Sequence, residues 1–193
     1  SPLFAQQGVT QCGTPTGQPK FPIETYQELP DPSSPSDKDW AAVTNPQISW
    51  GTIDTRYAKH RLPQLKKQQL TVLKGWRGER VNAQAVVWTG TEVKDLNFSF
   101  TDFKDKKGNS LSDEAFKAGF IRYVMTDELN KDGRGACGHR QAVDYDSLLV
   151  ADPIDTNLKS MSVPARTVQP IWVQCWIPQS ATPGTYQGEL LIN

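Results

Sequence analysis

The stretch that decides the fold is Gln169-Pro170-Ile171-Trp172-Val173-Gln174-Cys175-Trp176-Ile177-Pro178. Apolar side chains at alternate positions point to one side of an extended chain, and the other side carries Trp172, Gln174 and Trp176. A period of two residues is typical of a β-strand. The Thr-Pro-Gly sequence at 182–184 predicts a turn. A second alternating segment, residues 186–193, follows that turn and predicts another strand.

The sequence stops within this last predicted strand, so we expect the domain to be the N-terminal part of a longer protein. Its 193 residues suit one domain with a sizeable core. The 14 glycines and 14 prolines favour many turns and short strands over long helices. Further segments with strand character lie between the N-terminal region and the stretch quoted above, at residues 48–57, 65–73, 81–88, 96–101, 120–125, 147–154 and 163–169.

No helix alternates with these strands in a βαβ pattern. Half-apolar strands connected by turns favour an all-β fold, in which two antiparallel sheets cover each other. We therefore predict an antiparallel β-sandwich, jelly-roll-like, over residues 46–193. Phe120 to Met125 is apolar on both sides and should be a central strand.

The N-terminal region differs in composition from this predicted domain. Residues 6–45 contain six prolines, which predicts an irregular Pro-rich arm. A short helical turn is expected from Ser36 to Ala42, with Ser36 as its N-cap. Residues 1–5 resemble the end of a secretory signal peptide, with cleavage before Gln6. We therefore expect an exported protein, located in the periplasm or at the cell surface.

Charge and cysteine content limit the classes of partner. Lys plus Arg and Asp plus Glu number 21 each, so no net field attracts nucleic acid or an anionic membrane. No apolar run approaches the ~20 residues of a membrane span. In an oxidising compartment Cys12 and Cys137 are the candidate disulfide, whereas Cys175 is expected to be a buried free thiol. The absence of a CxxC pair argues against structural zinc, and we expect no cofactor.

Several acidic and nucleophilic residues are candidates for chemistry, and a structural role is favoured for each. Asp127 and Glu128 are adjacent after a buried strand, but neighbouring residues of an extended chain point to opposite faces. Cys137 and His139 match no thiol hydrolase. The acidic residues after position 143 lack the pattern of a calcium loop, and turn or capping roles are expected for Asp144, Asp146, Asp152 and Asp155. We predict no catalytic residue and no metal site.

The six tryptophans suggest another kind of site. Trp88, Trp172 and Trp176 fall on the less apolar side of their strands, and exposed aromatic rings on a sheet face can stack on sugars. They are the candidate carbohydrate-binding residues. The alternative is that this face is covered by the arm or by a neighbouring domain, and this alternative is favoured.

An ordered set of segments resembles the N-terminal domain of glycoside hydrolase family 123 proteins and the related DUF4091-type proteins of Bacteroidetes. The set is Trp50-Gly51 to Lys59, Trp76-Arg77-Gly78-Glu79-Arg80 to Gln84, Phe120 to Asp127, Cys137-Gly138-His139-Arg140, Leu149 to Asp155, Gln169-Pro170-Ile171-Trp172, and Ile177-Pro178 to Gly188. The resemblance implies a β-sandwich placed before a TIM-barrel domain that carries a catalytic Asp–Glu pair. No residue of that pair maps onto this chain.

These observations lead to two hypotheses from different classes. The first is a non-catalytic accessory domain of a secreted glycoside hydrolase, which supports the barrel or positions a glycan. Its partner is then a C-terminal catalytic domain of the same polypeptide. The second is a stand-alone carbohydrate-binding module that uses surface tryptophans. A free-standing hydrolase that uses Asp127 and Glu128 is the least favoured.

Overall fold

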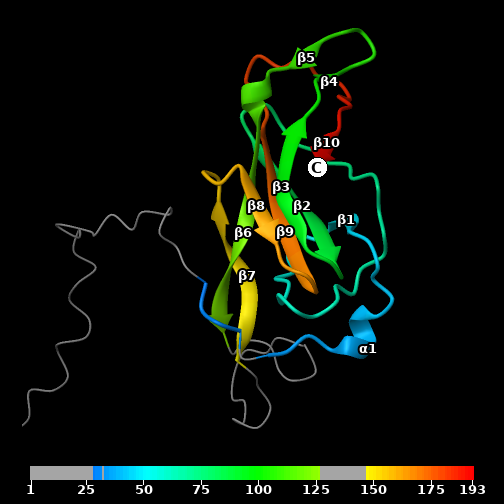
Figure 1. Cartoon of the computed structure of the whole chain (residues 1–193). Coiled ribbons are helices and arrows are strands. Elements are labelled where there is room, and N and C mark those ends of the chain that lie inside the picture. The colour runs from blue at the N-terminus through cyan, green and yellow to red at the C-terminus, as the bar shows by residue number, and fades with distance from the viewer. Residues whose placement is uncertain (1–27, 32, 127–146) are drawn as a thin grey trace, which may run out of the picture.

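The computed structural model describes residues 28–31, 33–126 and 147–193 (Figure 1). Two short helical elements occur in these ranges, α1 (Asp37–Trp40) and the 3-10 turn η2 (Asp113–Ala115). The side chain of Ser36 caps α1 by accepting a hydrogen bond from the backbone of Asp39, which confirms the predicted helical turn. All other regular structure in the described residues is β, as the composition predicted.

The strands form two main antiparallel sheets and a small hairpin. The larger sheet has the order β1 (Gln47–Gly51), β2 (Arg80–Thr89), β9 (Thr167–Trp176), β6 (Phe116–Thr126) and β7 (Leu148–Asp155). The smaller sheet has the order β10 (Leu190–Ile192), β3 (Val93–Phe100) and β8 (Ser160–Val163), and β4 (Phe103–Lys104) pairs with β5 (Ser110–Leu111). The predicted all-β, antiparallel architecture is confirmed.

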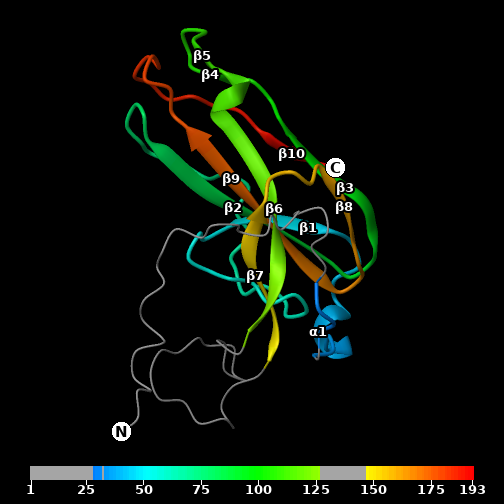
Figure 2. The ribbon, with the colours of Figure 1, turned by 90° about the vertical axis from the view of Figure 1, so that its left-hand side faces the viewer.

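The core lies between the two sheets, which Figure 2 shows as separate layers. One side of β2 and β9 contributes alternate residues such as Ala85 and Ile171, and Phe120 of β6 is fully buried beside them. Leu96 of β3 and Val163 of β8 meet them from the smaller sheet. The burial of these apolar side chains on both inner faces is the main contribution to the stability of a sandwich.

The opposite face of the larger sheet is partly covered by the chain's own N-terminal segments. Trp40 of α1 and Tyr57 pack with Val86, Trp88 and Val168 in a second cluster. The backbone of residues 57–59 also hydrogen-bonds to two strands, from Lys59 N to Leu149 O at 2.9 Å and from Val168 N to Lys59 O at 2.9 Å. These bonds fix the covering segment on the sheet, which decides how much of the tryptophan-bearing face remains accessible.

Several expected strands differ in the structure. β9 and β10, the two strands predicted from the C-terminal stretch, belong to different sheets, because the Pro- and Gly-containing segment between them carries the chain across the sandwich. Residues 53–57 and 65–73 contain no strand, although an isolated bridge joins Ala58 to Val150. Arg166 has a φ of 57°, and this left-handed residue lies in the turn that separates β8 from β9 within the predicted segment 163–169.

Candidate functional site

The three candidate tryptophans share one face of the larger sheet, as their alternation predicted, but their environments differ. Trp88 is only 7% exposed and lies among Trp40, Tyr57 and Val168, with the ammonium of Lys67 5.8 Å from its ring centre. Its assignment as a surface residue is therefore corrected. The strand pattern identified the face but not the segment that covers it, and Trp88 offers no ring for stacking on a sugar.

Trp172 and Trp176 lie further along the same face. Trp172 is half-buried against a cluster that includes Tyr123 and Leu149. Trp176 is 53% exposed, and the guanidinium of Arg80 lies 4.5 Å from its ring centre. The positions are four residues apart along β9, which separates them by about 13 Å. Trp176 alone of the three candidates presents most of its ring to solvent, and sugar binding by these residues stays a prediction.

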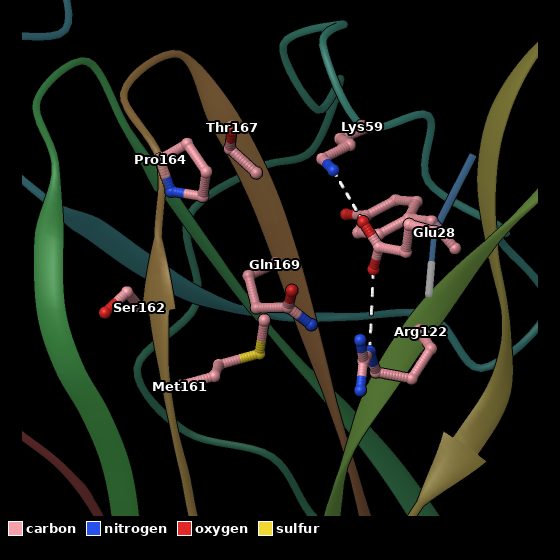
Figure 3. Close-up of a pocket in the computed structure, with 9 residues that line it drawn as sticks. Glu28, Lys59, Arg122, Met161, Ser162, Pro164, Thr167 and Gln169 are labelled. Atoms are coloured by element: carbon pink, nitrogen blue, oxygen red, sulfur yellow. Dashed lines mark hydrogen bonds and ion pairs between the residues drawn. The ribbon is translucent and has the colours of Figure 1, made fainter. Parts of the chain in front are cut away.

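A cleft of about 440 Å³ opens between β6 and β9 of the larger sheet and β8 of the smaller sheet. Figure 3 shows that Gln169 and Met161 lie on one side, and Arg122, Glu28 and Lys59 on the other. None of these residues was predicted to form a site. Glu28 belongs to the N-terminal arm, and no local pattern relates it to partners 31 and 94 residues away.

A chain of ion pairs joins the arm to the body at this cleft. The Glu28 carboxylate lies 2.6 Å from Lys59 Nζ and 3.5 Å from Arg122 Nε. The same Arg122 reaches Asp155 Oδ2 at 3.3 Å, and all four side chains are at most 17% exposed. In this partly buried environment the pairs are screened less than surface pairs. Two cations and two anions therefore neutralise one another within the cleft.

Tyr123 forms the floor of this region and is fully buried. Its hydroxyl donates a hydrogen bond to Val168 O, and the Lys59 ammonium lies 5.5 Å from its ring centre. Burial raises the pKa of Tyr123 well above its ordinary value, and the charge of Glu28 adds to this effect. The phenol therefore stays protonated at neutral pH and acts as a hydrogen-bond donor that joins β6 to β9.

A second contact holds the arm beside this cleft. Asp31 Oδ2 lies 3.9 Å from His60 Nε2, and the other nitrogen of that ring lies 2.8 Å from Arg166 O. Asp31 Oδ1 accepts hydrogen bonds from the backbone and side chain of Ser33 at 2.8 Å and 2.7 Å. Together with Glu28, these contacts indicate that the described arm residues, 28–31 and 33, are anchored to the domain.

Two of the acidic candidates, Asp152 and Asp155, lie in the part of the chain that the structure describes, and each has its own partners. Asp155 caps the following turn by accepting from Asn157 N at 3.0 Å and Leu158 N at 3.1 Å, and Asp152 pairs with Arg56 at 3.2 Å. The expected turn role is thus observed for Asp155, whereas Asp152 lies within β7 and forms an ion pair. Among the described residues no cluster of three or more His, Cys, Asp or Glu side chains forms a metal-binding group. The remaining candidates lie outside the described residues, namely Cys12, Asp127, Glu128, Cys137, His139, Arg140, Asp144 and Asp146.

Cys175 is buried and free, as predicted from its place on the apolar side of its strand. Burial raises the pKa of its thiol, which keeps the thiol protonated and unreactive.

Residues 1–27 are outside the described ranges, so the predicted signal remnant and most of the arm stay expectations. No helix among the described residues has the length and apolar character needed to cross a membrane.

One exposed apolar surface was not predicted from the sequence. It lies in residues 70–76, which lead into β2, and we call it the 70–76 ridge: Leu70, Val72, Leu73 and Trp76. Leu70 is 76% exposed, Val72 72% and Trp76 83%. The weak alternation of residues 65–73 suggested a strand, but residues 70–73 form no strand and present apolar side chains to solvent. The only local indication of this exposure is that a lysine and a glycine interrupt the apolar residues.

Comparison with known proteins agrees with the fold. The sequence model of the glycoside hydrolase 123 N-terminal domain matches residues 50–193. A solved structure of a family 123 glycoside hydrolase from Clostridium perfringens, described for glycolipid glycan hydrolysis, is similar with a TM-score of 0.63 and 22% identity. The match covers 78% of this chain and 24% of that protein. No curated protein matches this sequence. The match over both sheets shows that this chain belongs to the glycoside hydrolase 123 N-terminal domain family.

Proposed function

We propose that this chain is a non-catalytic accessory domain of a secreted glycoside hydrolase, and that it supports a TIM-barrel catalytic domain of the same polypeptide. The observation that carries the proposal is the family match over residues 50–193, which includes strands of both sheets. The similar Clostridium perfringens enzyme extends well beyond the shared region, since the match covers 24% of it. A domain of this kind contributes to stability or orientation, while the chemistry belongs to the rest of the polypeptide.

The charges of the cleft are consistent with a supporting role. Catalysis of glycoside hydrolysis by the usual route needs two carboxyl groups that flank the scissile bond. Here the Glu28 and Asp155 carboxylates are both engaged by Arg122, and Glu28 is also engaged by Lys59. Both carboxylates are therefore occupied by neighbouring cations, so neither is free of partners to flank a scissile bond.

The alternative is a carbohydrate-binding module, and one observation favours it. Trp176 presents a ring that is 53% exposed, with Arg80 stacked beside it, and aromatic rings combined with hydrogen-bond donors suit sugar recognition. A single exposed ring from the predicted set is a small platform, because Trp88 is buried and Trp172 is half-buried. Glycan positioning during catalysis would use the same ring.

Assays of the isolated 193-residue chain test this proposal. We expect no turnover of aryl glycosides and no reproducible binding on a glycan array, with thermal shift as the second readout. Reproducible binding that Trp176→Ala abolishes, with an unchanged melting temperature, would instead establish the module. Turnover by the isolated chain would contradict the non-catalytic role.

We also propose export to the periplasm or the cell surface. The support is the small residue before Gln6 at the sequence N-terminus. Fractionation of cells that produce the full precursor, followed by N-terminal sequencing, is the test. A protein found in the cytoplasm with an uncleaved N-terminus would contradict it.

A further inference from the structure

The 70–76 ridge is held in place at both ends, although its side chains face solvent. At one end Trp50 N donates to Gln68 O at 3.0 Å, which ties the segment to the edge strand β1. At the other end the α-carbon of Gly75 is packed so closely that an added methyl group would meet Ile177 and Val81 at 2.6 Å. The segment is therefore seated on the sheet, and the exposure of its apolar residues is built into the fold.

The ends of the ridge are fixed further by the turn that follows it. Trp76 N donates to the Glu79 carboxylate at 2.7 Å, and Glu79 N donates back to Trp76 O at 3.0 Å. Ile177 N donates to Glu79 O at 2.9 Å, which joins the turn to the end of β9. Trp76 is thus presented on an ordered turn that is joined to the end of β9, rather than at a free loop tip.

The ridge has a basic rim. Five basic residues and one acidic residue, Glu79, lie between positions 66 and 80, in a chain whose formal net charge is zero. All six are exposed, and the basic ones are Lys66, Lys67, Lys74, Arg77 and Arg80. Large apolar and Trp side chains at the centre, with Arg and Lys around them, are the composition of a protein interface with charge at its rim.

We infer that the 70–76 ridge is the surface on which the catalytic domain of the same polypeptide docks, by an apolar patch with an acidic rim. This inference rests on the proposed function. The occupant follows from two observations: the family is an N-terminal domain, and the shared region covers 24% of the similar enzyme, so most of that protein lies outside it. The basic rim specifies the charge that the partner surface presents.

Three properties of the ridge favour a protein domain over a sugar as its occupant. Leu70, Val72 and Leu73 are aliphatic and offer no flat ring for stacking. Trp76 is the only aromatic side chain of the ridge, and its backbone N–H is already used by Glu79. An extended segment from position 70 to 76 spans about 20 Å, which suits one edge of a domain interface.

The test compares hydrogen exchange in this isolated chain and in the full-length protein that carries it. We expect amides of residues 68–76 to exchange about tenfold more slowly in the full-length protein, because docking covers them. In that protein Val72→Glu should remove this protection. In the isolated chain Val72→Glu should leave the melting temperature unchanged, because the side chain is already 72% exposed.

A matched control lies at the opposite edge of the larger sheet. Ile154 of β7 is also β-branched and is 41% exposed, so Ile154→Glu introduces the same charge away from the ridge. We expect this variant to keep the protection of residues 68–76 in the full-length protein. Loss of protection in both variants would show a general charge effect and would overturn the inference.

The possible failures are distinguishable. Protection of another surface, with none over residues 68–76, would overturn the docking site and leave the proposed function intact. No protected surface anywhere would contradict both. A dimer of the isolated chain that Val72→Glu dissociates would assign the ridge to a second copy. Glycan binding lost in Trp76→Ser would assign it to a sugar.

Discussion

Trp88 and Trp176 show how two residues with the same place in a sequence pattern differ in energetic role. Both lie on the outer face of the larger sheet, but Trp88 is enclosed by Trp40, Tyr57 and Val168. Trp176 rests against Arg80 and is otherwise open to solvent. Removal of a buried ring leaves a cavity, whereas removal of an exposed ring does not.

We predict that Trp88→Ala lowers the free energy of unfolding by about 3–5 kcal/mol, because it creates a cavity under the covering segment. Trp176→Ala should cost less than about 1 kcal/mol, since it removes only an exposed cation–π contact. Urea unfolding of the isolated chain measures both. Equal losses in the two variants would contradict the assignment of Trp88 as a structural residue.

The buried phenol of Tyr123 makes the stability of the domain depend on pH in the alkaline range. Burial raises the pKa of its phenol, so the folded state keeps this proton at a pH where the unfolded chain has lost it. The contribution is fully present below the unfolded pKa of about 10 and is lost as pH rises through the folded pKa. The free energy of unfolding should therefore fall as the pH rises above about 10, where the unfolded chain begins to lose this proton.

We predict that Tyr123→Phe makes this decline shallower, and that it costs about 1–2 kcal/mol at pH 8 through loss of the hydrogen bond to Val168 O. Tyr57, whose pKa burial also raises, retains part of the slope. Urea unfolding at a series of pH values up to 11 measures the difference. A variant with the wild-type slope would show that Tyr123 is not responsible.

At the residue scale the sequence predicted which way side chains point but not what lies over them. The alternation of residues 169–178 correctly separated Cys175 from Trp176. It could not show that Trp40 and Tyr57 cover Trp88 on the outer face, because that coverage depends on contacts between segments distant in the chain. The same limit applies to Glu28, whose partners Lys59 and Arg122 come from two other segments.

At the scale of elements, the anchored arm residues Glu28 and Asp31 show how an arm can become part of a domain. Its Glu28 carboxylate bridges Lys59 and Arg122, each 17% exposed. Removal of one partner from a partly buried ion pair leaves the other without full compensation. The cleft is therefore a point of attachment for the arm.

We predict that Glu28→Gln lowers the free energy of unfolding by about 2 kcal/mol, since it weakens charged hydrogen bonds to Lys59 and Arg122. The control is Asp102→Asn, whose pair with Lys104 is more than half exposed. That change should leave the urea midpoint unaltered, because exposed pairs contribute little. Similar midpoints for Glu28→Gln and wild type would show that the arm is not held by this contact.

Strands were predictable where hydrophobic alternation coincided with burial. β2, β3, β6, β7, β9 and β10 all overlap segments proposed from the sequence. The expected strands in 53–57 and 65–73 failed for different physical reasons. Residues 57–59 lie across the sheet and bond to β7 and β9, while residues 70–76 present their apolar side chains to solvent. Alternation alone cannot distinguish a buried face from an exposed interface.

At the scale of the whole molecule, the fold and its family followed from the ordered set of segments, and the role did not. Strand order and the division into two sheets depend on long-range pairing, such as that of β2 with β9, which local patterns do not encode. The net charge, with 21 basic and 21 acidic residues, gave no indication of the basic rim of the 70–76 ridge, because acidic residues elsewhere in the chain compensate for it.

We propose that this domain supports a catalytic domain, and that the chemistry belongs to the rest of the polypeptide. The most direct measurement compares the full-length protein with its catalytic part produced without residues 46–193, by thermal inactivation of glycosidase activity. We predict a loss of roughly 5 °C or more in the inactivation midpoint without the domain, because an interface is removed. Unchanged activity and an unchanged inactivation midpoint in the shortened enzyme would contradict the account.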